Sequence, residues 1–224
     1  MAREETRVAV EGRELTLSNL EKVLFPETGF TKGQLIDYYV KVAPAILPHI
    51  ADRPVTLKRY PNGVDQKYFY EKHVPSHAPE WIRTAHVPST DGDKAIDYVV
   101  IDDLPTLVWA ANLGSIELHV PLWKVGRRRT LPAPPDLLVF DLDPGEGTTI
   151  VECCEVAEHV RQLLGEMDME CRPKTSGSKG LQIYAPLTGR PSWDTSRTLA
   201  HDVATQLERL HPDLIVSKMN KSLR

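Results

Sequence analysis

The stretch DLLVFDLDPGEG, residues 136–147, has an apolar run over 137–140, then Asp141 and Asp143 two residues apart, then a Pro-Gly turn. A short apolar run bounded by turn residues predicts a strand that is buried on both faces. Side chains alternate along a strand, so both carboxylates are expected on the same face. Two like charges this close repel, and each resists losing its water. A divalent cation would offset that cost, whereas an aspartate that caps the next turn would explain only one carboxylate.

The composition sets limits on the class of protein. With 224 residues and 41% apolar content, the chain can build one substantial core or two small ones. The net charge of −4 argues against a broadly basic nucleic-acid binder, so any polyanion must be held by a local basic patch. Three cysteines without metal-type spacing indicate reduced thiols. Without a long apolar run or an apolar signal core, we expect a cytoplasmic protein with no membrane contact.

Periodicity and capping signals predict a mixed α/β (α+β) unit over residues 1–224. A hairpin is expected at 8–10 and 15–17, and Thr31 with Gln34 forms a capping box before a helix. Thr149 with Glu152 caps a second helix that runs to about residue 164. Further helices are expected at 106–113 and 195–210, a loop at 123–135, and strands at 55–60, 97–101, 116–120, 171–175, 181–185 and from 214 to 217.

A second informative stretch is KTSGSKGLQIY, residues 174–184. Small residues and glycines around Lys179 let backbone N–H groups and one ammonium approach an anion closely. The glycine spacing is not that of a P-loop, and an ordinary glycine-rich hairpin turn remains an alternative. Beside a paired-aspartate strand, a lysine loop of this kind favours a nucleotidyl-transfer site, in which metal ions and the loop hold a triphosphate.

The two stretches FDLDPGEG and KTSGSKGL resemble the polymerase domain of bacterial ligase D, within the archaeo-eukaryotic primase superfamily. The resemblance extends, in order, to LSNLEKVLFPETGFTKGQLIDYY, RPVTLKRYPNG, KYFYEKHVP and GSIELHVPLW, and so covers nearly the whole chain. It implies a primase-like fold in which two small antiparallel sheets flank a catalytic cleft and helices cover the outside.

The resemblance also implies an activity and its partners. The activity is template-directed nucleotide addition that extends or fills broken DNA ends in bacterial non-homologous end joining, by a two-metal mechanism with Mn²⁺ or Mg²⁺. The substrates would be nucleoside triphosphates, with ribonucleotides preferred, and DNA ends that carry a 5′-phosphate. Ku and an ATP-dependent DNA ligase domain or protein are the implied partners, and the bacterial nucleoid is the implied location.

Residue by residue, Asp141 and Asp143 match the catalytic, metal-binding carboxylates of the family. The residues that match nucleotide contacts are Lys58, His119, Ser176 and Lys179, and Gln182 stands at a further position of this kind but differs from the family's usual residue. The residues that match contacts to DNA are Asn19, Lys22 and Lys32, for the 5′-phosphate, and Phe69 and Tyr70, for stacking on template bases.

These residues also have ordinary structural interpretations. His119 could be a core histidine, and Lys22 and Lys32 could be solvated charges on a helix face. Phe69 and Tyr70 would lie on opposite faces of a strand, so both can stack on bases only if their segment is a loop. As a set, however, the basic residues explain how a net-acidic protein holds a phosphate, and aromatic rings supply stacking that tolerates any base.

Two departures from the family pattern affect the expected activity. Gln182 stands where the family usually has a histidine, and glutamine can donate a hydrogen bond but carries no charge. The family's third metal-binding aspartate would lie beyond SKMNKSLR, so we expect the printed chain to lack the C-terminal part of the domain. These departures leave a catalytically weakened DNA-end-binding module as one alternative. A second alternative, which rests on the aspartate pair alone, is a phosphatase of the haloacid dehalogenase type, whose strand also ends in D-x-D.

Overall fold

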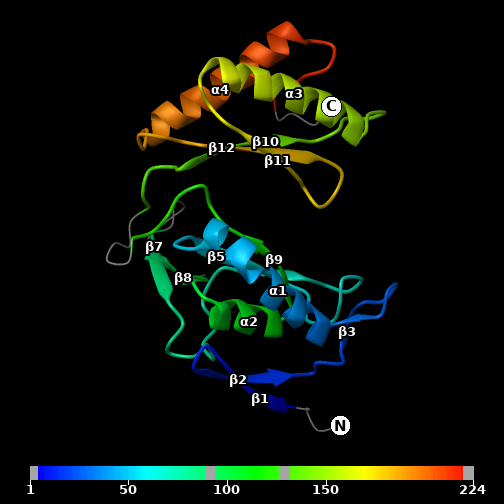
Figure 1. Cartoon of the computed structure of the whole chain (residues 1–224), viewed down its shortest axis with the longest axis vertical. Helices are drawn as coiled ribbons and strands as arrows, with labels where there is room; N and C mark the ends of the chain where they lie inside the picture. Colours follow the sequence, from blue (N-terminus) through cyan, green and yellow to red (C-terminus); the bar gives the residue numbers. More distant parts are fainter. Residues whose placement is uncertain (1–4, 89–93, 127–131, 219–224) are drawn as a thin grey trace. The chain divides into compact units, whose positions relative to one another are not determined.

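The computed structural model describes residues 5–88, 94–126 and 132–218, and the chain divides into two compact units, Met1–Ala133 and Pro134–Arg224 (Figure 1). Within the described ranges, small antiparallel sheets and four helices confirm the expected mixed α/β class. No helix in these ranges is both long enough and apolar enough to cross a membrane. A single domain with a cleft between its sheets stays a prediction.

The first unit opens with the expected hairpin and capped helix. Strand β1 (Glu5–Val10) pairs with β2 (Arg13–Ser18) across a turn in which Gly12 has φ +78°. Strands β3 (Val23–Phe25) and β4 (Phe30–Thr31) form a short antiparallel pair that leads into α1 (Lys32–Ile50). The Thr31 hydroxyl accepts from the backbone N–H of Gln34, and the side-chain oxygen of Gln34 accepts from the backbone N–H of Thr31. The predicted capping box therefore begins this helix.

A five-stranded antiparallel sheet forms the centre of the first unit. Strand β5 (Pro54–Arg59) pairs with β6 (Phe69–Glu71), β8 (Ile96–Val100) and β9 (Ser115–His119), and β7 (Thr84–Val87) pairs with β8. The strands predicted at 55–60, 97–101 and 116–120 are confirmed within a residue or so. Helix α2 (Leu104–Asn112) is capped by Asp103, and its fully buried apolar residues join α1 and the sheet in one core.

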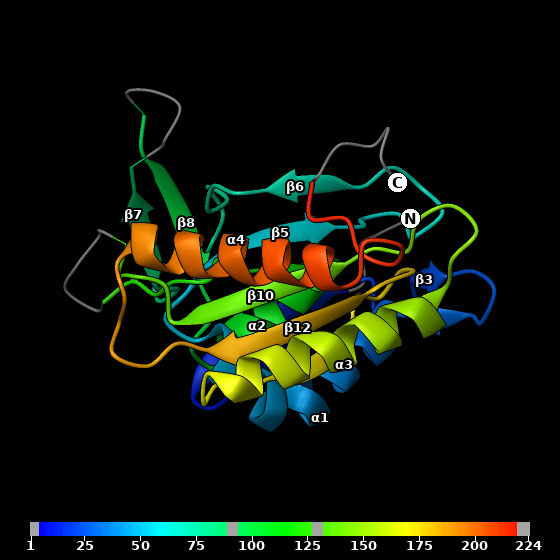
Figure 2. The same ribbon diagram turned by 90° about the horizontal axis from the view of Figure 1, so that it is seen from above.

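The second unit has one three-stranded antiparallel sheet, in the order β10 (Leu137–Leu142), β12 (Leu181–Pro186), β11 (Arg172–Thr175). Helices α3 (Ile150–Glu166) and α4 (Trp193–Leu210) lie over the same face of this sheet (Figures 1 and 2). The predicted Thr149–Glu152 capping box begins α3. Leu138, Ile183 and Leu164 are buried in the core between sheet and helices.

Two predictions for the second unit are wrong. Both helices of this unit lie over one face of its sheet, so only the even-numbered residues of β10 pack on the helix core, while Asp141 is exposed. The strand predicted from 214 to 217 is an irregular segment, because the N–H groups of Leu214 and Ile215 both donate to the His211 carbonyl (3.1 and 2.9 Å). These two backbone N–H groups are therefore not available to pair with a neighbouring strand.

Candidate functional site

The two aspartates lie at the end of β10, on the sheet face opposite to the helices. Leu142, between them, packs against the core of the second unit, whereas Asp141 and Asp143 are exposed. Because strand side chains alternate, the carboxylates project from one face, as the spacing predicts. Both side chains are exposed, so a hydrated divalent ion has access to them.

Gln182 is the hydrogen-bonding neighbour of Asp141. The two residues are opposite each other in the β10–β12 register, and Gln182 Nε2 donates to Asp141 Oδ1 at 3.1 Å. The Tyr184 hydroxyl in turn donates to Gln182 Oε1 at 3.0 Å, and burial followed by the nearby Asp141 charge raises the pKa of Tyr184. This chain of bonds fixes the orientation of Asp141, as outer-shell partners of metal-binding carboxylates do.

The lysine loop packs directly against the aspartate strand. The Ser176 hydroxyl accepts from the N–H groups of Ser178 (3.3 Å) and Gly180 (3.1 Å), which closes the loop. A Cβ on Gly180 would lie 2.1 Å from the Leu142 carbonyl oxygen and 3.5 Å from the Asp143 Cα, so only glycine fits there. The close approach brings Ser176, the exposed Lys179 and the aspartate pair to one end of the sheet.

The donor set at this end of the sheet suits a hard divalent cation. Aspartate oxygens are the ligands that Mg²⁺ and Mn²⁺ prefer. Among the described residues, however, no group of three or more His, Cys, Asp or Glu side chains is arranged to hold a metal ion. Asp141 and Asp143 therefore fit one ion, and a second ion would need ligands from elsewhere.

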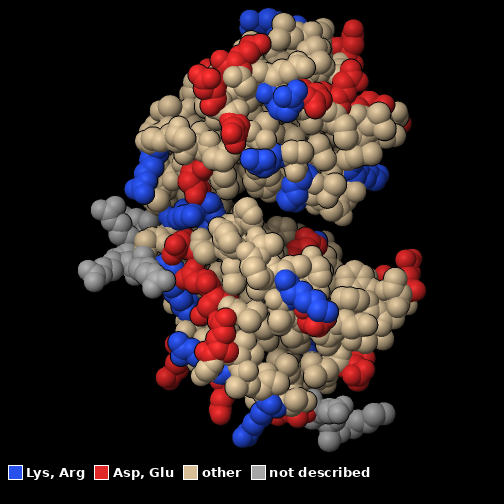
Figure 3. Space-filling model, in the orientation of Figure 1, with Lys and Arg blue, Asp and Glu red and all other residues tan. Residues whose placement is uncertain are grey.

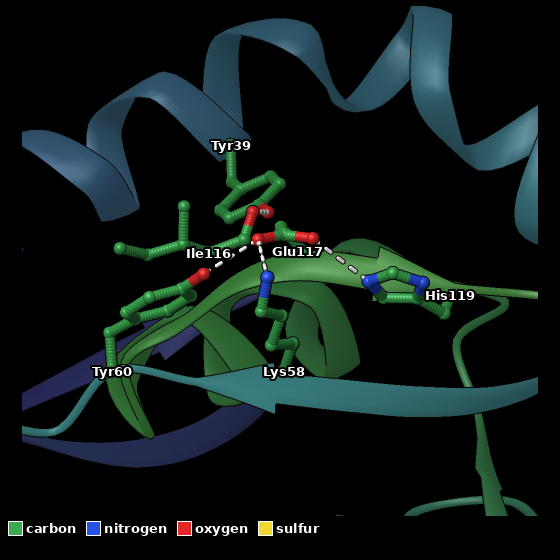
Figure 4. Close-up of polar contacts among 6 residues, drawn as sticks. All are labelled: Tyr39, Lys58, Tyr60, Ile116, Glu117 and His119. Carbon is green, nitrogen blue, oxygen red and sulfur yellow. Dashed lines mark hydrogen bonds and ion pairs between the residues drawn. The ribbon is translucent and has the colours of Figure 1, made fainter. Parts of the chain in front are cut away.

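The first unit places Lys58 and His119 on one face of its sheet, together with Glu117 and Tyr60 (Figure 4). Lys58 Nζ donates to Glu117 Oε1 at 2.6 Å, and His119 Nε2 lies 2.9 Å from Glu117 Oε2. His119 is exposed and not a core histidine. The two residues expected at the nucleotide thus share a carboxylate partner that the sequence did not identify.

Phe69 and Tyr70 lie in strand β6, not in a loop. Tyr70 is opposite Lys58 in the register, and its ring is 5.6 Å from the His119 ring, whereas Phe69 is opposite Arg59, whose guanidinium lies over its ring. The two aromatics therefore point to opposite faces, and a joint stack of both on one run of bases does not fit this strand. Tyr68, which the sequence did not single out, instead pairs edge-on with Tyr70 at 5.9 Å.

Asn19, Lys22 and Lys32 line one cavity of about 660 Å³ in the first unit. Lys22 Nζ donates to Asn62 Oδ1 at 2.8 Å, and Lys32 Nζ donates to the Asn112 carbonyl oxygen at 2.9 Å. The cavity also lies at the start of α1, where the helix dipole favours an anion. The predicted phosphate-binding residues are thus brought together, and Lys32 is buried at 5% exposure instead of being a solvated surface charge.

On the face drawn in Figure 3, acidic and basic side chains are interspersed over each unit. This agrees with the net charge of −4. Anion binding at such a surface depends on local groups such as the lysine cavity and the lysine loop, because a broadly basic field is lacking on this side.

An aspartate pair beside a lysine loop, on a mixed α/β fold with small antiparallel sheets, is compatible with the class of phosphate-transferring proteins. Comparison with known proteins gives the family. The family model "LigD, primase-polymerase domain" matches residues 31–224, and this chain belongs to that family. This membership replaces the phosphatase alternative.

Relatives and a solved structure agree with this assignment. The chain is 45% identical over 208 residues to the multifunctional non-homologous end joining protein LigD of Mycolicibacterium smegmatis, covering 93% of this chain and 27% of that protein. It is 29% identical over 205 residues to the bifunctional LigD of Bacillus subtilis, covering 91% of this chain and 32% of that protein. The polymerase domain of Mycobacterium tuberculosis ligase D, solved in complex with DNA, matches with a TM-score of 0.89 at 45% identity, over 94% of this chain and 74% of that chain. The chain thus spans about a quarter to a third of the curated relatives' length.

Proposed function

We propose that this chain is a template-directed nucleotidyltransferase that adds nucleotides at broken DNA ends in bacterial non-homologous end joining. The observation that carries the proposal is the contact of Gly180 with the end of β10, which places the lysine loop beside the aspartate pair. Family membership and the DNA complex of the M. tuberculosis relative support it. Ku, an ATP-dependent ligase and ribonucleoside triphosphates are proposed as partners, and the cytoplasm, at the nucleoid, as the location.

In this proposal each group of residues has one task. Asp141 and Asp143 would hold a divalent ion, Mn²⁺ or Mg²⁺, which supplies charge stabilisation for the transferred phosphoryl group. Ser176 and Lys179 bind triphosphate oxygens, with Lys179 contributing a positive charge. Because the amide of Gln182 donates to Asp141, this residue orients the carboxylate, and it contacts the triphosphate only if that bond is exchanged.

A second candidate function is a DNA-end-binding module with a weakened catalytic half. It is favoured by the finding that, in the described part of the chain, only two carboxylates stand at the expected metal site. The lysine cavity of the first unit does not depend on that site, so DNA binding can persist without catalysis.

Nucleotide incorporation by the printed chain tests both candidates. We expect the chain, with Mn²⁺ and four ribonucleotides, to extend a primer in a one-nucleotide gap by the base complementary to the template. Asp141→Asn with Asp143→Asn should abolish extension, while Asp168→Asn, an exposed aspartate of the same unit, should leave it unchanged. Binding of gapped DNA without any incorporation would select the end-binding module. A chain that neither extends nor binds gapped DNA would overturn the proposal.

Metal titration gives a further prediction for the same site. Two carboxylates should hold one divalent ion weakly, because a two-ion site needs ligands shared between ions roughly 3.5–4 Å apart. Isothermal titration of the nucleotide-free chain with Mn²⁺ should therefore show a single weak site that Asp141→Asn with Asp143→Asn removes. Two tight sites in the unmutated chain would contradict this prediction and would indicate a ligand beyond the pair.

A further inference from the structure

Glu117 lies at the centre of the polar cluster on the β5–β9 face (Figure 4). Its Oε1 accepts from Lys58 Nζ at 2.6 Å and from the Tyr60 hydroxyl at 2.7 Å, and its Oε2 lies 2.9 Å from His119 Nε2. Both carboxylate oxygens are therefore in use. Each of the three partners would lose a hydrogen bond if the carboxylate were removed.

The sheet register explains why these side chains meet. Lys58 and Glu117 are cross-strand neighbours in the β5–β9 pairing, and His119, two residues after Glu117, projects from the same face. Lys58 Nζ also lies over the rings of Tyr68 (4.5 Å), Tyr60 (5.4 Å) and Tyr70 (5.7 Å). The Lys58 side chain is 14% exposed, so the flexible lysine is confined between three rings and one carboxylate.

The ionisation of the cluster agrees with this arrangement. Burial alone would raise the pKa of Glu117, but the bonds from Lys58, Tyr60 and His119 outweigh it and lower the pKa, so Glu117 is ionised at neutral pH. The hydrogen bond to Glu117 raises the pKa of Lys58 above its ordinary value, which keeps the amine charged.

We propose that Glu117 is a positioning residue that holds the Lys58 ammonium and the His119 imidazole in the orientations in which they bind the incoming nucleotide. This inference rests on the proposed function and on the family resemblance, which implies that Lys58 and His119 contact the nucleotide. Glu117 itself acts through these two residues. Glu117 holds the lysine side chain, which has four rotatable bonds, and the histidine ring in one conformation before the nucleotide binds. Less conformational entropy is then lost on binding.

The alternative is that Glu117 is a bystander carboxylate beside an anion site, and the two models predict opposite signs. Removing a negative charge near a triphosphate strengthens binding if only charge matters. Removing the group that orients Lys58 and His119 weakens binding, although the site becomes more positive. The direction of the change in nucleotide affinity therefore separates them.

The first experiment measures the reactivity of Lys58 directly. The chain is treated with acetic anhydride at neutral pH, and the acetylation rate of each lysine is followed by mass spectrometry, with the 71% exposed Lys41 as internal reference. We expect slow acetylation of Lys58 in the unmutated chain and an increase of about tenfold in Glu117→Ala, because only an unprotonated, accessible amine reacts. Equal rates for Lys58 in both chains would overturn the inference.

The second experiment measures the dissociation constant of a Mn²⁺–ribonucleoside triphosphate complex. Glu117→Ala should weaken binding by about 5- to 20-fold, within the range of coupling seen for contacting charged groups. Glu117→Gln should lose less, since its amide oxygen still accepts from Lys58 or Tyr60. Asp52→Asn is the matched control with no expected effect, because Asp52 also pairs with an arginine at 2.6 Å and is similarly exposed (43% against 40%).

A double-mutant cycle tests whether Glu117 acts through Lys58 or only stabilises the fold. In a Lys58→Met background, Glu117→Ala should weaken binding clearly less than it does in the unmutated chain. Equal losses in both backgrounds, or tighter binding by Glu117→Ala, would overturn the positioning role. If the unmutated chain binds no nucleotide, the proposed function is overturned, and the positioning role with it. This outcome differs from failure of the positioning role alone, because it is seen without any substitution.

Discussion

Gly180→Ala should lower the free energy of unfolding of the unit Pro134–Arg224 by about 3 kcal/mol, at the upper end of typical overpacking costs. The added Cβ would lie 2.1 Å from the Leu142 carbonyl oxygen. Side-chain rotation cannot relieve this clash, because the oxygen is a backbone atom and the Cβ position is fixed by the backbone at residue 180. The loop and the end of β10 must therefore separate. Since this contact aligns Ser176 with the aspartate pair, affinity for a Mn²⁺–nucleotide complex should also fall, by about tenfold. Urea unfolding and nucleotide titration measure the two effects.

Gly165→Ala is the matched control for this substitution. Gly165 lies within α3 of the same unit, and a Cβ there meets no atom within 4 Å. The same chemical change should raise stability by about 0.5–1 kcal/mol, because alanine is the better helix former. Opposite signs for the two variants are the expected result. A stability of Gly180→Ala equal to that of the unmutated chain would show that the loop does not depend on this contact.

Local signals in the sequence predicted much of the fold. The capping boxes at Thr31 and Thr149 depend on residues three apart, and the structure has both helices where these signals place them. The aspartate pair was also identifiable, because its spacing and the strand before it are local features. By contrast, burial of β10 on both faces could not be judged from its apolar run, since that depends on which elements pack on each face of the sheet.

The missed site residues depend on long-range register. Glu117 meets Lys58 only because β9 pairs with β5 in one particular register, 59 residues apart in the chain. Whether Phe69 and Tyr70 lie in a strand or in a loop likewise depends on the β5–β6 pairing, which the local sequence left open. An available signal was the i, i+2 spacing of Glu117 and His119 in a predicted strand, which places a carboxylate beside the histidine.

The 5′-phosphate at a DNA break provides the last prediction. The printed chain should bind gapped DNA with a downstream 5′-phosphate about 10- to 100-fold more tightly than the same DNA with a 5′-hydroxyl, or about 1–3 kcal/mol. The reason is the cavity in which Lys22 and Lys32 are linked by a backbone hydrogen bond of 2.8 Å, from the Lys32 N–H to the Lys22 carbonyl. Because the contact is mainly ionic, the preference should shrink as salt is added.

Substitutions separate this preference from general attraction to DNA. Lys22→Ala should remove most of the preference, and adding Lys32→Ala the rest, whereas Lys41→Ala, which removes the same charge from an exposed site on α1, should weaken both DNA ends equally. Lys32 also donates to the Asn112 carbonyl, so the single Lys22 variant carries the test if the double variant is unstable. Asp141→Ala with Asp143→Ala should preserve the preference, since that pair belongs to the other compact unit. Fluorescence anisotropy measures both affinities. Equal affinity of the unmutated chain for the two DNA ends at low salt would contradict the assignment of a phosphate pocket. Lys22 and Lys32 would then be structural residues at the start of α1, with Lys32 also bonded to the end of α2.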